Sequence, residues 1–167
     1  MAGKTEHDIL LSWLNDAYSM ENSLIQVLEH RVKDAKDYPT VQAADERHLE
    51  QTRRHAEAIK GCIERLGGST SSIKSVLANL FGQMQAPMTG MATDEIVKNF
   101  LTDYAAECFE VASYRSLIAA AADLGDRETL AVCERNLQED QAMATWLLDN
   151  IPMITREQQG HLAQARS

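Results

Sequence analysis

The chain has 167 residues, a formal net charge of −9 and a hydrophobic content of 44%. This length supports one domain with a real core and is too short for two. Nucleic-acid backbones and anionic membrane surfaces repel an acidic protein, so we expect neither as a partner. The first residues show no signal-peptide pattern, and no apolar run approaches the roughly 18 residues of a membrane span, so we expect a cytoplasmic protein.

The three cysteines Cys62, Cys108 and Cys133 each lie inside a helical pattern. Their number is odd and they show no CxxC or CxxxC spacing, which disfavours both a zinc site and a disulfide framework. We therefore expect small buried thiols in a reducing compartment.

Two long helices are expected in the first part of the chain. The first begins at a cap, either Thr5 or Asp8, and runs to about Ala35. The second opens at Pro39, a favoured first helical residue, and ends at Gly67-Gly68.

Polar side chains interrupt the apolar stripes of both helices. Glu21 sits in the middle of the first stripe, and His48 and His55, two turns apart, lie on the second. Glu29 and Glu50 fall on the other faces and are interpreted as solvated charges.

Residues 67–93 form the longest connection of the chain. Within it, helical spacing predicts a short helix from the apolar residues Ile73, Val76, Leu77, Leu80 and Phe81. A long ordered crossover predicts that the helices on either side of it run parallel.

Two further helices are expected after this connection. The third begins at Thr93-Asp94-Glu95 and runs to about Leu124, where Gly125 closes it. The fourth begins near Asp126 and is expected to end at Pro152. The sequence thus predicts an all-α four-helix bundle over residues 1–154 with a crossover between its second and third helices, followed by a polar tail over 155–167.

The third helix carries a carboxylate at the centre of its apolar stripe. The stripe comprises Phe100, Tyr104, Glu107, Val111, Tyr114, Ile118 and Ala121. Glu110 lies at its near flank, and on the fourth helix Asp140 lies at the inward flank while Glu139 faces away. A buried carboxylate is costly unless it is paired, hydrogen-bonded or bound to a metal.

Each of the four helices thus brings a metal-capable side chain inward. Carboxylates with one or two imidazoles suit iron or manganese, and carboxylates from several helices can bridge two ions. Taken singly, an inward Glu is as often answered by Arg, Tyr or water, and a lone His is more often a satisfied core residue. The coincidence on four helices favours a metal, because Glu21 and Glu107 have no inward Arg or Lys to pair with.

Four stretches carry a resemblance to a known family: 15–21 (NDAYSME), 48–52 (HLEQT), 107–114 (ECFEVASY) and 136–140 (NLQED). They resemble the YciE/YciF family of bacterial ferritin-like proteins over nearly the whole chain. The resemblance implies a ferritin-like bundle, a homodimer, an association with stress responses and a site of di-iron type. Carried over by position, it implies the metal-capable set Glu21, His48, His55, Glu107, Glu110 and Asp140.

The sequence also departs from the family pattern. Gln51 stands where relatives have Glu, Asp140 is a shortened Glu, and Ala144 replaces a common Asp. The Glu-x-x-His pair that two helices of a full di-iron centre carry is absent. The site is therefore expected to hold one ion, two weakly, or none.

Three hypotheses follow. The first is a protein that binds iron, or manganese, between its helices, with Glu107 or Glu21 bridging and with a histidine and Asp140 as terminal ligands. Such a protein could oxidise ferrous iron with oxygen or peroxide. The second is a metal-free helical protein that acts as a dimer, in which tyrosines and histidines satisfy Glu21 and Glu107. The third, a DNA-protecting cage, is disfavoured by the charge and the lack of a basic cluster.

Overall fold

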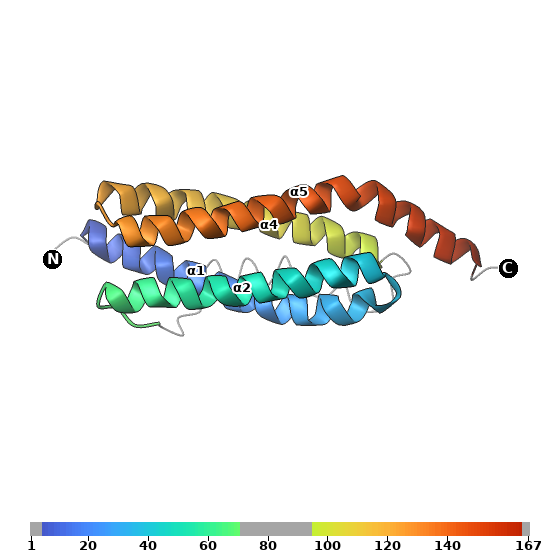
Figure 1. Ribbon diagram of the computed structural model, residues 1–167, viewed down its shortest axis with the longest axis horizontal. Coiled ribbons are helices and arrows are strands. Elements are labelled where there is room, and N and C mark those ends of the chain that lie inside the picture. Colours follow the sequence, from blue (N-terminus) through green and yellow to red (C-terminus); the bar gives the residue numbers. More distant parts are fainter. Residues whose placement is uncertain (1–4, 71–94, 165–167) are drawn as a thin grey trace.

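The computed structural model describes residues 5–70 and 95–164, which form a four-helix bundle (Figure 1). Its long helices are α1 (Glu6–Asp34), α2 (Pro39–Arg65), α4 (Glu95–Asp123) and α5 (Arg127–Gln164). A short 3₁₀ turn, η1 (Ala35–Asp37), joins the first two. These ranges contain no strand, and the predicted all-α four-helix bundle is confirmed.

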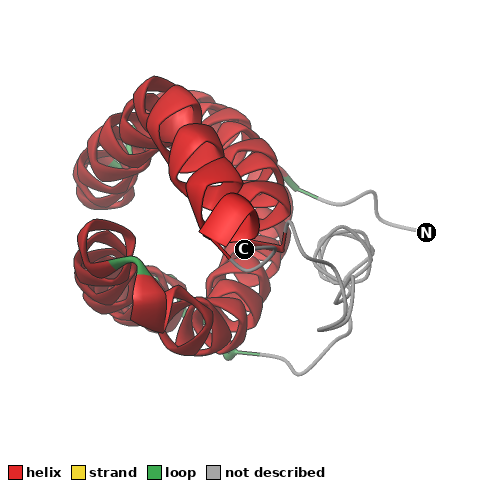
Figure 2. Cartoon of the chain, turned by 90° about the vertical axis from the view of Figure 1, so that its right-hand side faces the viewer, coloured by secondary structure: helices red, strands yellow, loops and turns green. Residues whose placement is uncertain are grey.

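The helices pair as two antiparallel hairpins, α1 with α2 and α4 with α5. Across the hairpins, α1 contacts α4 and α2 contacts α5. The end-on view shows the helices arranged around a common centre (Figure 2). Helices α2 and α4 run in the same direction, which agrees with the expected long crossover. The predicted short helix at 73–81 lies outside the described residues.

The starts of the first two helices follow the sequence signals. The Thr5 hydroxyl accepts a hydrogen bond from the Asp8 amide at 3.1 Å, and Asp8 Oδ2 accepts one from the Thr5 amide at 2.9 Å. This capping box selects Thr5, rather than Asp8, as the cap of α1. Pro39 occupies the first turn of α2, where its missing amide hydrogen costs nothing.

Two glycines end helices in a left-handed backbone conformation. Gly67 has φ of 77° after α2, and Gly125 has φ of 69° after α4. At the first of these ends, the Gly68 amide donates to the Ile63 carbonyl at 2.9 Å and satisfies an otherwise unpaired carbonyl.

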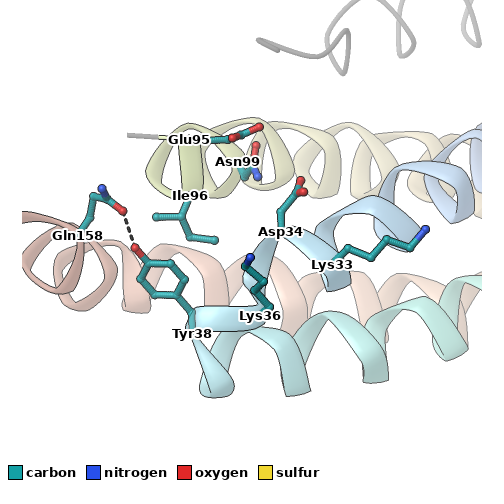
Figure 3. A pocket seen from close by; sticks show the side chains of 8 residues that line it. All are labelled: Lys33, Asp34, Lys36, Tyr38, Glu95, Ile96, Asn99 and Gln158. Carbon is teal, nitrogen blue, oxygen red and sulfur yellow. Dashed lines mark hydrogen bonds between the residues drawn. The ribbon is translucent and has the colours of Figure 1, made fainter. Parts of the chain in front are cut away.

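The expected end of the last helix at Pro152 is wrong. Helix α5 continues through Pro152 to Gln164 and changes direction in its last third, as a proline kink does (Figure 1). The extension is held because Ile154 is fully buried and the Tyr38 hydroxyl donates to Gln158 Oε1 at 2.5 Å (Figure 3). The helix therefore crosses the predicted boundary at residues 154–155, and the division into bundle and tail stays a prediction.

The inward face of α4 is turned relative to the predicted stripe. Tyr104, Val111 and Ile118 are only half-buried. The fully inward positions include Asp103, Ala106, Glu107, Glu110, Tyr114 and Leu117. Apolar residues of α4 occur on all sides of the helix, so hydrophobic periodicity located its buried face only approximately.

Helix α5 shows the same kind of error. The helical spacing of Leu130, Leu137 and Leu148 predicts an inward Leu148, but this residue is 50% exposed, whereas its neighbour Leu147 is buried. The buried row of α5 contains Thr129, Asn136 and Asp140. A pattern that scores apolar residues misses a row that is partly polar.

The prediction for the cysteines is right for two of the three. Cys62 and Cys133 are buried free thiols, but Cys108 is exposed. Cys108 follows Glu107 by one residue, which turns it about 100° away from the buried face of α4.

The buried residues form two apolar clusters. The larger contains Leu14, Leu24 and Ile59, and the smaller contains Phe100 and Leu147. Buried polar side chains from all four helices occupy the core as well. No helix in the described part of the chain is long and apolar enough to cross a membrane.

Replacing Gly67 with alanine is expected to destabilise the protein by about 1 kcal/mol, because an L side chain is strained at positive φ. The matched control is Gly61→Ala, inside α2, where an added Cβ meets no atom within 4 Å. This control should stabilise by about 0.5–1 kcal/mol, since glycine disfavours helix interiors. Denaturant unfolding measures both; equal effects of the two substitutions would contradict the role of the Gly67 conformation.

Candidate metal centre

All six residues predicted to be metal-capable lie buried on the inner faces of the four helices. Glu21 comes from α1, His48 and His55 from α2, and Asp140 from α5; α4 supplies the remaining pair. Each of the six residues is at most 2% exposed. These four carboxylates and two imidazoles thus form one buried polar layer, from which water is largely excluded.

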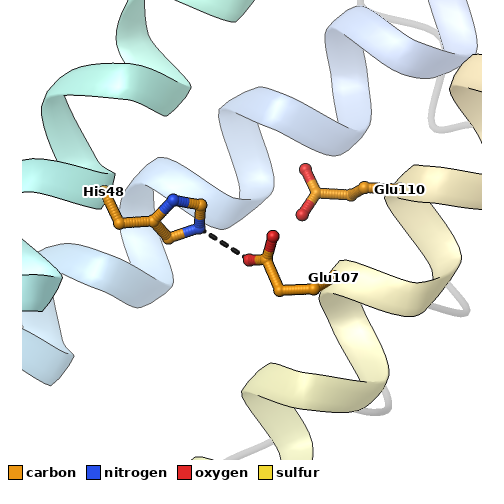
Figure 4. Close-up of side chains that lie close together, drawn as sticks. All are labelled: His48, Glu107 and Glu110. Carbon is orange, nitrogen blue, oxygen red and sulfur yellow. Dashed lines mark ion pairs between the residues drawn. The ribbon is translucent and has the colours of Figure 1, made fainter. Parts of the chain in front are cut away.

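His48, Glu107 and Glu110 form the tightest group (Figure 4). One nitrogen or oxygen atom from each lies within 4.8 Å of the others. His48 Nε2 lies 2.7 Å from Glu107 Oε1, and the Glu110 carboxylate points toward the same space. Two hard oxygen ligands and an imidazole at this spacing fit a divalent ion such as Fe²⁺ or Mn²⁺.

His55 collects a second group of carboxylates. Its Nδ1 lies 3.4 Å from Asp140 Oδ1 and 3.7 Å from Glu21 Oε1. Its Nε2 lies 3.1 Å from Glu139 Oε2. One ring nitrogen therefore faces the interior, while the other contacts a carboxylate near the surface, an arrangement that orients metal-binding histidines in proteins.

Glu139 was expected to face away from the core, and this expectation is wrong. Its side chain is 28% exposed, and besides His55 it contacts Arg54 at 3.4 Å. The long Glu side chain reaches back to the edge of the buried layer from a position beside Asp140. The position of a residue on a helix gives the direction of its Cα–Cβ bond, but it does not tell where the end of a long side chain lies.

Tyr114 and Asn136 surround Glu21. The buried Tyr114 hydroxyl donates a hydrogen bond to Glu21 Oε1 and accepts one from Asn136 Nδ2 at 3.0 Å. The sequence predicted that tyrosines could satisfy Glu21 and Glu107, and Tyr114 lies on the predicted stripe, but Asn136 was not singled out. The available signal was that Asn136 is a polar residue on the same face of α5 as Cys133 and Asp140.

Several carboxylate oxygens in the layer have no hydrogen-bond partner among the described residues. They are Glu21 Oε2, Glu107 Oε2, both oxygens of Glu110 and both oxygens of Asp140. Burial and the charges of Glu107 and Asp140 raise the pKa of Glu110 well above its usual value. Unpaired acceptors that are held this deeply fit a bound cation, which would supply the missing partner.

Thr52 explains why the ligand set is smaller than that of a full di-iron centre. It stands three residues before His55, where a Glu-x-x-His motif would place its carboxylate. The buried Thr52 hydroxyl instead donates to the His48 carbonyl at 2.9 Å. As expected, the charges of Glu29 and Glu50 lie outside, both paired with the exposed Arg53.

A further acidic pair lies one helical turn from this layer and was missed by sequence reasoning. The single Nε–H of Arg31 donates to both carboxylate oxygens of Asp103, each at 3.0 Å. Burial, and then the charge of Asp103, raises the pKa of Asp45 to about 7. Arg31 of α1 therefore supplies one positive charge to this pair, and the inner carboxylates have no comparable cation within the described ranges.

The metal-free protein is expected to lose stability as pH rises between about 4 and 9. Burial, followed by the charges of Glu21 and Glu107, raises the pKa of Asp140 to about 9, against about 3.9 in an unfolded chain. Between these values the folded protein holds a proton that the unfolded chain releases, so raising pH favours unfolding. The pKa shifts of Glu110, His48 and His55 are also upward and act in the same direction.

Chemical denaturation at several pH values in the presence of a chelator measures this dependence. Asp140→Asn should reduce the slope by up to about 1.4 kcal/mol per pH unit, the value for one proton. Asp149→Asn, an exposed position on the same helix, should leave the slope unchanged. A slope that survives Asp140→Asn in full would contradict the role given to Asp140.

Known proteins are similar to this chain in sequence and in architecture. The family described as a domain of unknown function (DUF892) matches residues 5–160. Protein YciF of Escherichia coli is 27% identical over 152 residues, which cover 87% of this chain and 90% of that protein. A structure from Xanthomonas campestris matches with a TM-score of 0.81 and 30% identity, and covers 95% of this chain and 98% of its own.

A bacterioferritin from Desulfovibrio desulfuricans also matches, with a TM-score of 0.75 and 23% identity over 98% of this chain and 91% of that one. At this identity the match shows a shared fold. The matches to the family and to YciF agree with the resemblance carried by the sequence motifs. The chain belongs to the DUF892 family, the YciE/YciF family of ferritin-like proteins.

Proposed function

We propose that this protein binds iron, or less favourably manganese, in the buried layer between its helices. The observation that carries the proposal is the set of unpartnered carboxylate oxygens on Glu21, Glu107, Glu110 and Asp140. Four carboxylates without a neutralising cation would repel one another in a dry interior. One or two divalent ions would remove this cost, and mixed oxygen and nitrogen ligands suit iron and manganese.

The geometry supports distinct roles for the six residues. His48, Glu107 and Glu110 would hold one ion, because their ligand atoms already converge. His55, Glu21 and Asp140 are the candidates for a second ion, with Glu139 orienting the His55 ring from outside. Glu107 or Glu21 would bridge, and a histidine and Asp140 would be terminal ligands.

The fold neighbours support iron as the metal. One is described as a bacterioferritin with a diiron site, and another, from Bacillus anthracis, as a ferritin-like diiron-carboxylate protein. Bound iron would supply electron transfer to oxygen or peroxide, which makes oxidation of ferrous iron the proposed reaction. Because the chain lacks a Glu-x-x-His motif, the proposal rests first on metal binding and only second on catalytic turnover. YciF of E. coli is described as a stress protein, and we extend that association to this chain as part of the proposal.

One observation favours the metal-free alternative in part. Tyr114 already satisfies one oxygen of Glu21, and His48 pairs with one oxygen of Glu107. In that alternative, Glu110 and Asp140 would remain protonated, in line with their raised pKa values. The protein would then act as a helical interaction module, and neutral substitutions in the layer would stabilise it without affecting any ligand.

Elemental analysis after anaerobic reconstitution with ferrous iron tests the proposal. The wild-type protein should retain at least one iron per chain, and Glu107→Gln should lose most of it. Glu50→Gln, an exposed position on α2, is the matched control and should retain the wild-type amount. If the folded wild-type protein retains neither iron nor manganese, the metal-free alternative is correct.

We propose that the protein acts in the cytoplasm as a homodimer. Leu101 of α4 and Leu148 of α5 are each about half exposed, which suits a protein-protein contact on this hairpin. Light scattering coupled to size exclusion should give twice the mass of the chain, 18.6 kDa. Leu101→Glu with Leu148→Glu should yield the monomer mass, and a monomeric wild-type protein would contradict the proposal.

A further inference from the structure

We infer that Tyr114 is a positioning residue that leaves Glu21 only one oxygen with which to bind a metal ion. The inference rests on the proposed metal site and concerns how one ligand is presented to it. Tyr114 is fully buried, and its hydroxyl donates to Glu21 Oε1. The other oxygen, Glu21 Oε2, is buried and has no hydrogen-bond partner among the described residues.

Asn136 fixes the direction of this hydrogen bond. Its Nδ2 donates to the Tyr114 hydroxyl at 3.0 Å, so the hydroxyl oxygen acts as the acceptor on that side. The single hydroxyl hydrogen is then available to Glu21 Oε1. Tyr114 and Asn136 lie on α4 and α5, and together they hold a carboxylate that projects from α1.

The Tyr114 ring is itself held in place. It meets the His55 imidazole edge-on, with ring centroids 6.2 Å apart and planes at 81°. Edge-to-face contact is a favoured arrangement of neighbouring rings. A rigid phenol is therefore placed between the α1 carboxylate and the α2 histidine of the same group.

The other carboxylates of the layer lack such a clamp. Both Glu110 oxygens have no hydrogen-bond partner in the described part of the chain, and Glu107 contacts His48, another candidate ligand. Neither carboxylate is fixed by a neutral donor outside the ligand set. Glu21 thus offers one oxygen to a metal ion, so a bridge that uses both oxygens of one carboxylate is assigned to Glu107 rather than to Glu21.

Tyr114→Phe tests this assignment, because it removes the hydroxyl and keeps the ring. Manganese affinity, measured by titration calorimetry, should fall by roughly 10-fold, as for other losses of groups that orient ligands. Metal-minus-apo infrared spectra should lose a carboxylate signal of one-oxygen coordination and gain a two-oxygen signal. A tyrosine with a purely structural role would alter the unfolding free energy and leave these spectra unchanged.

Tyr104→Phe on the same helix is the matched control, since Tyr104 is half-buried and belongs to the smaller apolar cluster. It should match the wild type in affinity and in infrared spectra. If wild type and Tyr114→Phe bind manganese with equal affinity and identical spectra, the positioning role is wrong while the metal site stands. If the wild type binds neither manganese nor iron, the proposed function itself fails and the inference falls with it.

A crystal structure of the manganese-loaded wild-type protein gives an independent check that does not require the variant to fold. Glu21 should contact the ion through one oxygen, with the other still bonded to Tyr114. Coordination through both Glu21 oxygens would overturn the inference.

Discussion

The burial of four carboxylates in one layer is the constraint on which the rest of this structure depends. Each costs several kcal/mol to desolvate without a partner, yet Glu110 and Asp140 have no hydrogen bond within the described ranges. The surroundings compensate only in part. Histidines face two of the carboxylates, and one tyrosine serves a third. The apolar clusters and four long helices supply the stability that allows such a layer to exist.

The contrast between two acidic groups shows what the layer lacks. Asp103 is also buried, but Arg31 donates to both of its carboxylate oxygens and supplies a full positive charge. The protein therefore supplies the Arg31 guanidinium as counter-ion to Asp103, a buried carboxylate outside the candidate ligand set. One turn further along α4, Glu107 meets only an imidazole, and Glu110 meets no partner. Asp103 thus has a counter-ion within the protein, whereas Glu107 and Glu110 are free to bind an external cation.

Much of this architecture could be predicted from the sequence because the signals are local. Capping at Thr5, the Gly67 stop and the inward positions of Glu21 and Glu107 follow from cap chemistry and periodicity. Features that depend on contacts between distant segments could not be predicted. Helix α5 passes Pro152 because contacts at its far end compensate, and Glu139 reaches His55 because its side chain is long and flexible.

Contacts along the seam between α2 and α5 limit how the bundle can open. At one end Arg65 of α2 contacts Asp126 before α5 at 2.7 Å, and at the other Tyr38 is bonded to Gln158. Both contacts join the α1–α2 hairpin to the α4–α5 hairpin, which the chain links through the long connection between α2 and α4. We therefore expect this seam to open more readily in its middle than at its two ends. Glu139 lies in this middle part, between solvent and the buried layer, so we expect local opening of a few helical turns there to expose the interior.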